Sequence, residues 1–370
     1  MKTITKNTFN ILLLSILLSM SFTVKANSTA TTGEPQISTG YFCAFYIDNK
    51  GTLWAWGKNN QSQIGVASSS PKYTPVKIMD NVLKVSSGEE HTMILKNDHT
   101  LWTVGYNSYG RLGTGKDFSE STPQKITDKV IDIAAGKDFS LFVKEDHTLW
   151  SMGVNNWGQL VNGNQDFQII PAKVLDDVLA VSGGANHTLI LKTDHTLWGV
   201  GHNNNHQLGE TKGKPVFSPI KIASDVIQMS AGVQFTLFIK SDGSLWGTGV
   251  NGYGQIKDNG GYSIHNPEKL MTDVSYASAG KEQSVVVKKD GTLWGAGRNE
   301  MGELGLGNTT NKAGFVKIMD DVVMAETSNS FTIALKKDGT VWSTGSNGSG
   351  QQGRGTGFQN SKVFEQITFK

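Results

Sequence analysis

Short apolar runs separated by polar turns recur along most of the chain. Residues 187–191 and 196–200, for example, are rich in β-branched and aliphatic side chains, and each run is too short for a helix. The polar turn between them makes this a typical antiparallel hairpin pattern. A further run, such as residues 219–222, follows the long loop of each copy. The pattern predicts an all-β protein assembled from small groups of strands.

These groups repeat at a fixed interval of 48 residues. Its clearest marker is a tryptophan, found at Trp54, Trp102, Trp150, Trp198, Trp246, Trp294 and Trp342. A glycine three residues later and an asparagine five residues later keep the same interval in every copy. A fixed period of about 20 to 50 residues is the signature of a repeat architecture. We therefore expect a seven-bladed β-propeller over residues 37–370, with one four-stranded blade per 48-residue repeat.

The middle strands of each copy are apolar along nearly their whole length, which indicates burial between neighbouring blades. The repeated tryptophan is then expected to be a buried wedge between blades. A parallel β-helix is the main competing fold, but tight hairpins cannot join parallel strands. The hairpin turn carries Asp-Gly in three copies, where glycine suits a positive φ. His99, His147 and His195 replace that glycine, and histidine tolerates the left-handed region.

The N-terminus resembles a secretory signal peptide. Basic residues precede an apolar run over residues 11–24, and a small-residue site ends at Ala26. The run is shorter than the roughly 20 residues of a spanning helix, so a membrane anchor is disfavoured. We expect a signal peptide over residues 1–26, a short lead over 27–36, and a protein that is periplasmic or secreted.

Charge and cysteine content exclude several classes of function. Cleavage after Ala26 would remove three lysines and no acidic residue, which changes the net charge from +2 to −1. A nucleic-acid partner is not expected, because no basic block is present. Cys43 is the only cysteine, so neither an intrachain disulfide nor a cysteine-based zinc site can form. We expect a monomer without cofactor.

Two sets of variable residues fall on the end of the propeller that carries the long loops, where binding residues concentrate. The first set, two residues after the repeated asparagine, contains the aromatic or Met side chains Tyr109, Trp157, Tyr253 and Met301. Such side chains either form interface hot spots or pack locally as loop caps. The second set follows an upstream repeated glycine and includes Glu89, Glu90, Lys137, Asp138, Lys281 and Glu282. These charges suit selective recognition, or they belong to solvated turns.

Neither catalysis nor metal binding is expected. Glu89, Glu90, Asp138 and Glu282 supply carboxyl groups of the kind that glycosidases pair, but nothing in the sequence sets their separation. His91 and His187 share a repeat position with phenylalanines, which indicates packing. The three histidines of the hairpin turns lie on separate blades at the opposite end, too far apart for one zinc ion.

The stretch from Gly184 to Gly209, which reads GANHTLILKTDHTLWGVGHNNNHQLG, resembles the repeat of the regulator of chromosome condensation family. The resemblance covers residues 37–370 and implies a seven-bladed propeller. In the founding member it also implies nucleotide exchange on a small GTPase and chromatin binding. That exchange depends on a wedge-like insertion, and the uniform 48-residue interval leaves no room for one. The chain is also similar to exported bacterial propellers with this repeat, among them a proteinaceous inhibitor of β-lactamases.

Together these features predict a non-enzymatic, exported binding protein that docks a protein partner through its loops. An inhibitor of a secreted enzyme is the first alternative. A glycan-binding protein or carbohydrate-active enzyme is the second.

Overall fold

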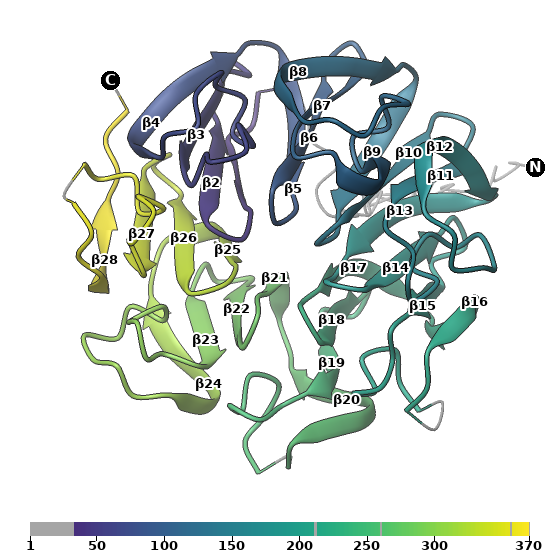
Figure 1. Ribbon diagram of the computed structural model, residues 1–370. Coiled ribbons are helices and arrows are strands. Elements are labelled where there is room, and N and C mark those ends of the chain that lie inside the picture. The colour runs from purple at the N-terminus through teal and green to yellow at the C-terminus, as the bar shows by residue number, and fades with distance from the viewer. Residues whose placement is uncertain (1–32, 211–212, 260, 356, 370) are drawn as a thin grey trace, which may run out of the picture.

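The computed structural model describes residues 33–210, 213–259, 261–355 and 357–369. Within these residues, seven four-stranded antiparallel sheets surround a central axis (Figure 1). The strands of each sheet follow chain order from the axis outward. The predicted all-β, seven-bladed propeller with one four-stranded blade per repeat is confirmed. We number the blades 1 to 7 along the chain.

The strands fall into four concentric rings. The innermost are β1 (Gln36–Thr39), β5 (Val82–Ser87), β9 (Val130–Ala135), β13 (Val178–Gly183), β17 (Val226–Ala231), β21 (Val274–Ala279) and β25 (Val322–Thr327). The second ring holds β2 (Cys43–Ile47), β6 (His91–Lys96), β10 (Phe139–Lys144), β14 (His187–Lys192), β18 (Phe235–Lys240), β22 (Gln283–Lys288) and β26 (Phe331–Lys336). The third ring holds β3 (Leu53–Gly57), β7 (Leu101–Gly105), β11 (Leu149–Gly153), β15 (Leu197–Gly201), β19 (Leu245–Val250), β23 (Leu293–Gly297) and β27 (Val341–Gly345). The outermost are β4 (Lys72–Met79), β8 (Glu120–Thr127), β12 (Gln168–Leu175), β16 (Val216–Ala223), β20 (Ser263–Met271), β24 (Lys312–Met319) and β28 (Ser361–Gln366).

The hairpin between the second and third strands is held by a short side-chain network. In blade 4, Thr196 donates both its backbone N–H and its hydroxyl to Asp194 Oδ1, at 3.0 and 2.6 Å. The indole of Trp198 donates to Thr196 Oγ1 at 2.7 Å. His195 has a φ of +63°, so the left-handed turn predicted for the histidines is confirmed. Five blades share this Asp-x-Thr-x-Trp arrangement, blade 5 has Ser244 in place of the threonine, and in blade 1 the Trp54 indole donates to Asp48 Oδ2 at 3.3 Å.

The core is a ring of apolar clusters, each lying between two neighbouring blades. Phe139 of blade 3, for example, packs with Val181 and Ile190 of blade 4. The second strands are buried along almost their whole length, as the apolar runs predicted. The repeated tryptophans differ from the expected buried wedge. Trp198 packs against this interface but is only half-buried, and the Lys192 ammonium lies 5.8 Å from the centre of its ring.

Blades 7 and 1 close the ring by side-chain packing, since each sheet is made from consecutive strands. The indole of Trp56 in β3 donates to the carbonyl of Gln351 at 2.9 Å. Phe369, beyond β28, places its ring 4.7 Å from that of Tyr46 and 6.0 Å from that of Trp56. The C-terminal segment therefore covers the first blade.

The described residues contain no helix with the length and apolarity needed to cross a bilayer. Their one helix is the single 3-10 turn η1 (Ser108–Gly110). The expected signal peptide over residues 1–26 lies outside the described residues.

Candidate functional site

The two ends of the propeller differ in what they carry. Because neighbouring strands are antiparallel, the first-to-second turn and the long third-to-fourth loop of a blade share one end. We call this end the loop face. The opposite end, the turn face, carries the Asp-x-Thr-x-Trp hairpins and the links between blades. All of the predicted binding residues lie on the loop face.

The repeated asparagine organises each long loop from beneath. Asn155 is fully buried, and its Oδ1 accepts the backbone N–H of Leu160 at 2.9 Å. Its Nδ2 donates to the carbonyls of Asn164 and Asp166 at 3.0 and 3.1 Å. A buried Gln159 then accepts the N–H of Trp157 at 2.9 Å. Sequence reasoning noted the asparagine spacing without its role, which is to hold variable loops on a constant frame.

The four predicted aromatic and Met residues each start from this frame but end in different environments. Tyr109 is 55% exposed and Met301 is 37% exposed. Trp157 and Tyr253 are half-buried, and Trp157 packs edge-on against His202 with ring centres 4.5 Å apart. Among the described residues, no ring contact joins Tyr109, Trp157 and Tyr253 to one another. The structure therefore separates the local caps from the exposed candidates.

Tyr109 belongs to an exposed apolar cluster that spans blades 2 and 3. Its ring meets that of Phe167 edge-on, with centres 5.6 Å apart, and Phe167 is 56% exposed. The start of β12 continues the surface with Ile169 and Ile170, which are 40% and 59% exposed. The Gly115 N–H donates to the Ile169 carbonyl at 3.1 Å, which ties the loop of blade 2 to blade 3. We call Tyr109, Phe167, Ile169 and Ile170 the apolar rim patch.

The predicted charged residues form ion pairs around the axis on the loop face. Glu89 of blade 2 pairs with Lys137 of blade 3 at 3.3 Å. The other pairs are Lys58–Glu90 at 3.0 Å, Arg111–Asp138 and Arg298–Glu282 at 3.0 Å. The pairs Glu89–Lys137, Lys58–Glu90 and Arg111–Asp138 link neighbouring blades, whereas Arg298–Glu282 lies within blade 6. Three of the pairs therefore connect blades and are not isolated charges on solvated turns. For Lys281, no ion pair is found among the described residues.

The innermost strands surround a central cavity of about 180 Å³. Serine side chains link neighbouring blades there, as when Ser230 Oγ accepts the Ala279 N–H at 2.9 Å. Glu326 accepts hydrogen bonds from the hydroxyls of Tyr276 and, at 2.9 Å, Ser278. Burial raises the pKa of Glu326 to about 7, against the opposing effect of these hydrogen bonds and of the Lys84 charge. Serine occupies the repeat position of Ser230 in five of the seven copies, and Ala134 and Glu326 occupy it in the other two, a signal that sequence reasoning overlooked.

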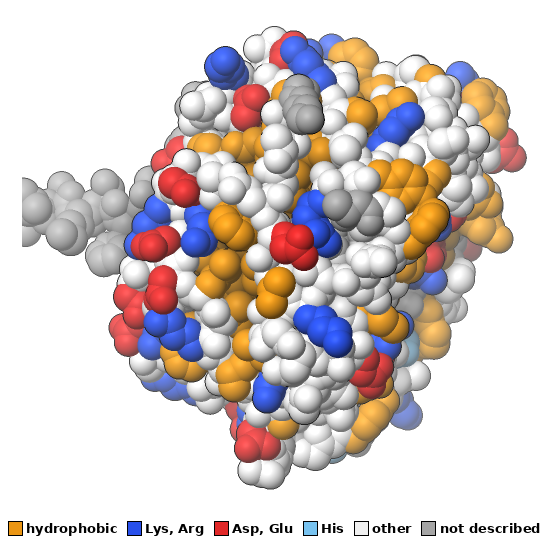
Figure 2. Space-filling model, turned by 90° about the vertical axis from the view of Figure 1, so that its left-hand side faces the viewer, with side chains coloured by type: hydrophobic (Ala, Val, Ile, Leu, Met, Phe, Trp, Pro, Cys, Tyr) orange, Lys and Arg blue, Asp and Glu red, His pale blue; other side chains and the backbone are white. Residues whose placement is uncertain are grey.

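The outer flank of the molecule carries no continuous field of one sign on the side drawn in Figure 2, where basic and acidic side chains are interspersed. Ion pairs such as Lys77–Asp80 and Lys317–Asp320, at 2.8 and 2.7 Å, follow the ends of outer strands. On this side, no stripe of basic residues is visible of the kind typical of proteins that bind nucleic-acid phosphates.

Fold and face together define a β-propeller whose rigid blades present variable loops at one end. Two models of the regulator of chromosome condensation (RCC1) repeat match the sequence. One matches residues 50–95, 98–143, 146–191 and 194–239; the other matches 82–111, 130–159, 178–207, 226–255 and 326–351. These matches cover more than half of the chain, which belongs to the RCC1 repeat family. Blade 6 lies outside them, yet it has the same four strands.

Solved structures show the same fold at low sequence identity. Human WBSCR16 is 20% identical with a TM-score of 0.77, over 86% of this chain and 94% of that one. Prp20p of Saccharomyces cerevisiae, described with its binding to Gsp1p and histones, is 19% identical with a TM-score of 0.77, over 92% of this chain and 87% of that one. Yeast RCC1 (Prp20) bound to Kap60 is 19% identical with a TM-score of 0.77, over 91% of this chain and 84% of that one. No curated protein matches the sequence.

Proposed function

We propose that this protein is a non-enzymatic binding module that docks a protein partner on its loop face, with the apolar rim patch at the centre of the contact. The observation that carries the proposal is the pair Tyr109 and Phe167. Both rings are more than half exposed, and they touch each other across two blades. Exposed apolar clusters on soluble proteins mark interaction sites, and aromatic side chains dominate interface energies.

The rigid frame beneath the patch supports this function. Tyr109 follows the buried Asn107, whose Oδ1 accepts the Leu112 N–H at 2.8 Å. Because the loop is held in place before binding, a partner gains contacts without ordering the loop first. The ion pairs nearer the axis supply polar groups that favour selectivity over affinity.

Relatives support the class of partner and not its identity. Yeast Prp20 binds the proteins Kap60, Gsp1p and histones. We extend to this chain only the use of a propeller for protein binding. We also propose export, on the N-terminal pattern, and therefore a partner outside the cytoplasm.

The absence of catalysis remains part of the proposal. The four carboxyl groups from which a glycosidase pair could have come, those of Glu89, Glu90, Asp138 and Glu282, each form an ion pair with a lysine or arginine. An enzyme inhibitor is a special case of the proposed docking, in which the partner is a secreted hydrolase.

The test is capture of partners by the purified protein from the surroundings of the source cells. The bait is compared with a Tyr109→Asn/Phe167→Ser variant; asparagine tolerates the φ of +64° at position 109. Tyr262→Ser is the matched control, because Tyr262 is a 70% exposed aromatic residue in a long loop of another blade.

We expect one protein, identified by mass spectrometry, to bind the wild type and the control but not the double variant. The captured partner would then be purified and its binding to the propeller measured again. If the propeller also inhibits an enzymatic activity of that partner, the propeller is an inhibitor. Equal capture by all three baits would reject the patch, and binding only to a glycan array would reject protein docking.

A further inference from the structure

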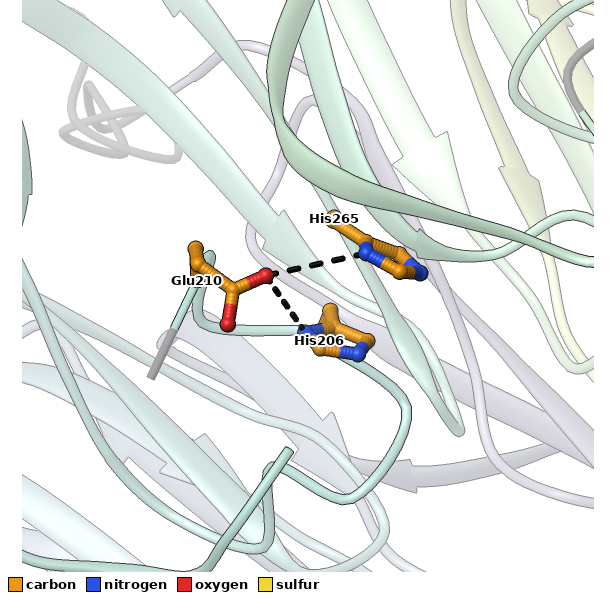
Figure 3. Close-up of side chains that lie close together, drawn as sticks. All are labelled: His206, Glu210 and His265. Atoms are coloured by element: carbon orange, nitrogen blue, oxygen red, sulfur yellow. Dashed lines mark ion pairs between the residues drawn. The ribbon is translucent and has the colours of Figure 1, made fainter. Parts of the chain in front are cut away.

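Blades 4 and 5 meet on the loop face in a cluster of two histidines and one glutamate (Figure 3). His206 and Glu210 lie in the loop between β15 and β16, whereas His265 lies in β20 of the next blade. The two imidazole rings stack with centres 3.9 Å apart and planes 17° apart. One potential ligand atom from each of the three residues lies within 4.8 Å of the other two.

The distances inside the cluster do not fit ordinary hydrogen bonds. Nδ1 of His206 and Nδ1 of His265 both face Oε2 of Glu210, at 3.5 and 3.6 Å. Hydrogen bonds between N–H and O span about 2.7 to 3.2 Å. In a tetrahedral zinc site with bonds of about 2.0 to 2.1 Å, neighbouring ligand atoms are about 3.3 Å apart. These two N···O separations are close to the edges of such a tetrahedron, and metal binding requires the stacked rings to turn so that a lone pair of each points at one ion.

One of the potential ligand atoms is buried and lacks a hydrogen-bond partner. Nδ1 of His206 is shielded from solvent and makes no hydrogen bond among the described residues. Buried polar atoms are normally paired, and an exception calls for an explanation such as an ion. A metal bound between the three side chains would satisfy this nitrogen.

The repeat shows how unusual the cluster is. The residue at the position of His206 is glycine in five of the seven copies and Ser62 in the sixth. In those five copies the glycine packs directly on the next blade, so that a Cβ on Gly110 would lie 2.2 Å from Ile169 Cα. His206 adopts the same left-handed conformation, with a φ of +63°. Ile169 follows Gly110 by 59 residues, and His265 follows His206 by the same number. The contact of His206 on the next blade is therefore the second histidine, His265.

The backbone of His206 is also fixed in place. Its carbonyl accepts a hydrogen bond from Thr248 Oγ1 of blade 5 at 2.8 Å, and its N–H donates to the Asn203 carbonyl at 3.0 Å. A ligand held by two blades before binding loses little freedom when it binds a metal.

We propose that His206, His265 and Glu210 form a binding site for a divalent transition metal, with Zn²⁺ as its best-suited ion. Two imidazoles and one carboxylate are a donor set that zinc uses, and a fourth position stays open for water or an outside ligand. The bound ion joins the loop of blade 4 to the outer strand of blade 5. It lies apart from the apolar rim patch, so the site stands independently of the proposed partner.

The experiment measures zinc binding to the full protein, purified without a histidine tag, by titration against a coloured chelator. Co²⁺ is the second probe, because its visible spectrum reports tetrahedral coordination by protein ligands directly. Three variants remove one ligand each: His206→Gly, Glu210→Gln and His265→Ala. The first restores the residue that five other blades use, and His265 has a side chain 57% exposed, so the variants should fold.

The matched control is His99→Gly, because His99 has a φ of +61° and four other blades have glycine at this turn position. His99 faces Glu145 at 3.4 Å on the turn face, which gives a similar histidine–carboxylate pair without a second imidazole. We expect one zinc per wild-type chain, at least about 10-fold weaker binding in each ligand variant and no change in the control. The site would be overturned if the wild type showed no saturable zinc binding. It would also be overturned if the His206→Gly and His265→Ala variants bound zinc as tightly as the wild type.

Discussion

The turn face and the loop face of the same blades follow opposite strategies. On the turn face, Thr196 joins Asp194 to Trp198, and the corresponding Thr148 joins Asp146 to Trp150 with nearly equal distances. On the loop face, the constant residues lie underneath, and only the outer layer varies. The residues of the turn face are therefore constant because they hold the hairpins together. On the loop face, the buried residues hold the structure and the exposed residues above them are free to vary for recognition.

The largest expected effect comes from breaking the buried frame of the loop face. Asn155→Ala removes the acceptor for the Leu160 N–H and the donor to two loop carbonyls. Leaving those groups unpaired is expected to lower the free energy of unfolding by about 3 kcal/mol. Chemical denaturation measures it, with the exposed neighbour Asn156→Ala as a control that should change stability by less than about 0.5 kcal/mol. Equal effects would show that depth does not separate the two roles.

On the turn face, Trp198→Ala tests how much a half-buried tryptophan contributes. A fully buried Trp or Phe costs about 3 to 5 kcal/mol when truncated, and here part of the ring faces solvent and Lys192. We expect a loss of about 2 to 3 kcal/mol in the free energy of unfolding. A loss below about 1 kcal/mol would show that the ring contributes no packing between blades.

A pH-dependent effect tests the strand starts beneath the loop face. His187 is fully buried, and burial lowers its pKa to about 3. Below its ordinary value of about 6.5 the unfolded chain takes up a proton that the folded chain refuses, so stability falls as pH falls from there toward 3. Between pH 7 and 5 this histidine should cost about 2 kcal/mol.

His187→Gln is the matched comparison, because Gln283 occupies the same repeat position in blade 6 and donates to the Ser328 carbonyl at 2.9 Å. His91, with a pKa also near 3, and Glu326, whose raised pKa acts in the opposite direction, titrate in both proteins and cancel. Denaturation at pH 7 and pH 5 should show a smaller loss in the variant. Identical losses would mean that His187 is protonated in the folded state.

The smallest stability effect belongs to the outer layer of the loop face. Tyr109→Asn with Phe167→Ser removes exposed rings above an intact frame. The expected change in the free energy of unfolding is below about 0.5 kcal/mol per substitution. A loss above about 2 kcal/mol, seen by denaturation, would identify these rings as caps and not as a contact surface.

How far the sequence predicts this molecule follows from the same division. The seven tryptophans at a constant interval predicted the number of blades, and the histidine at the turn position of blade 4, His195, predicted a left-handed backbone there. These features repeat because local turns and neighbouring strands determine them. The partial burial of Trp198 was missed, since spacing carries no information on which side of a ring is covered.

The sequence predicted which end of the propeller carries the binding loops, but not which side chains meet there. Tyr109 was identified, but its contact Phe167 lies in the next blade and does not share its repeat position. His206 and His265 were missed for the same reason, although His206 breaks the glycine pattern of its repeat position. Contacts between loops of different blades depend on loop conformation, which no spacing rule supplies.

The most direct test of the account compares binding and stability in one variant. The affinity of the captured partner is measured for the wild type, for Tyr109→Asn/Phe167→Ser and for Tyr262→Ser, beside their unfolding curves. The account predicts at least about 10-fold weaker binding by the double variant alone, with all three proteins equally stable. Unchanged affinity in a stable double variant would contradict the claim that this protein acts through its apolar rim patch.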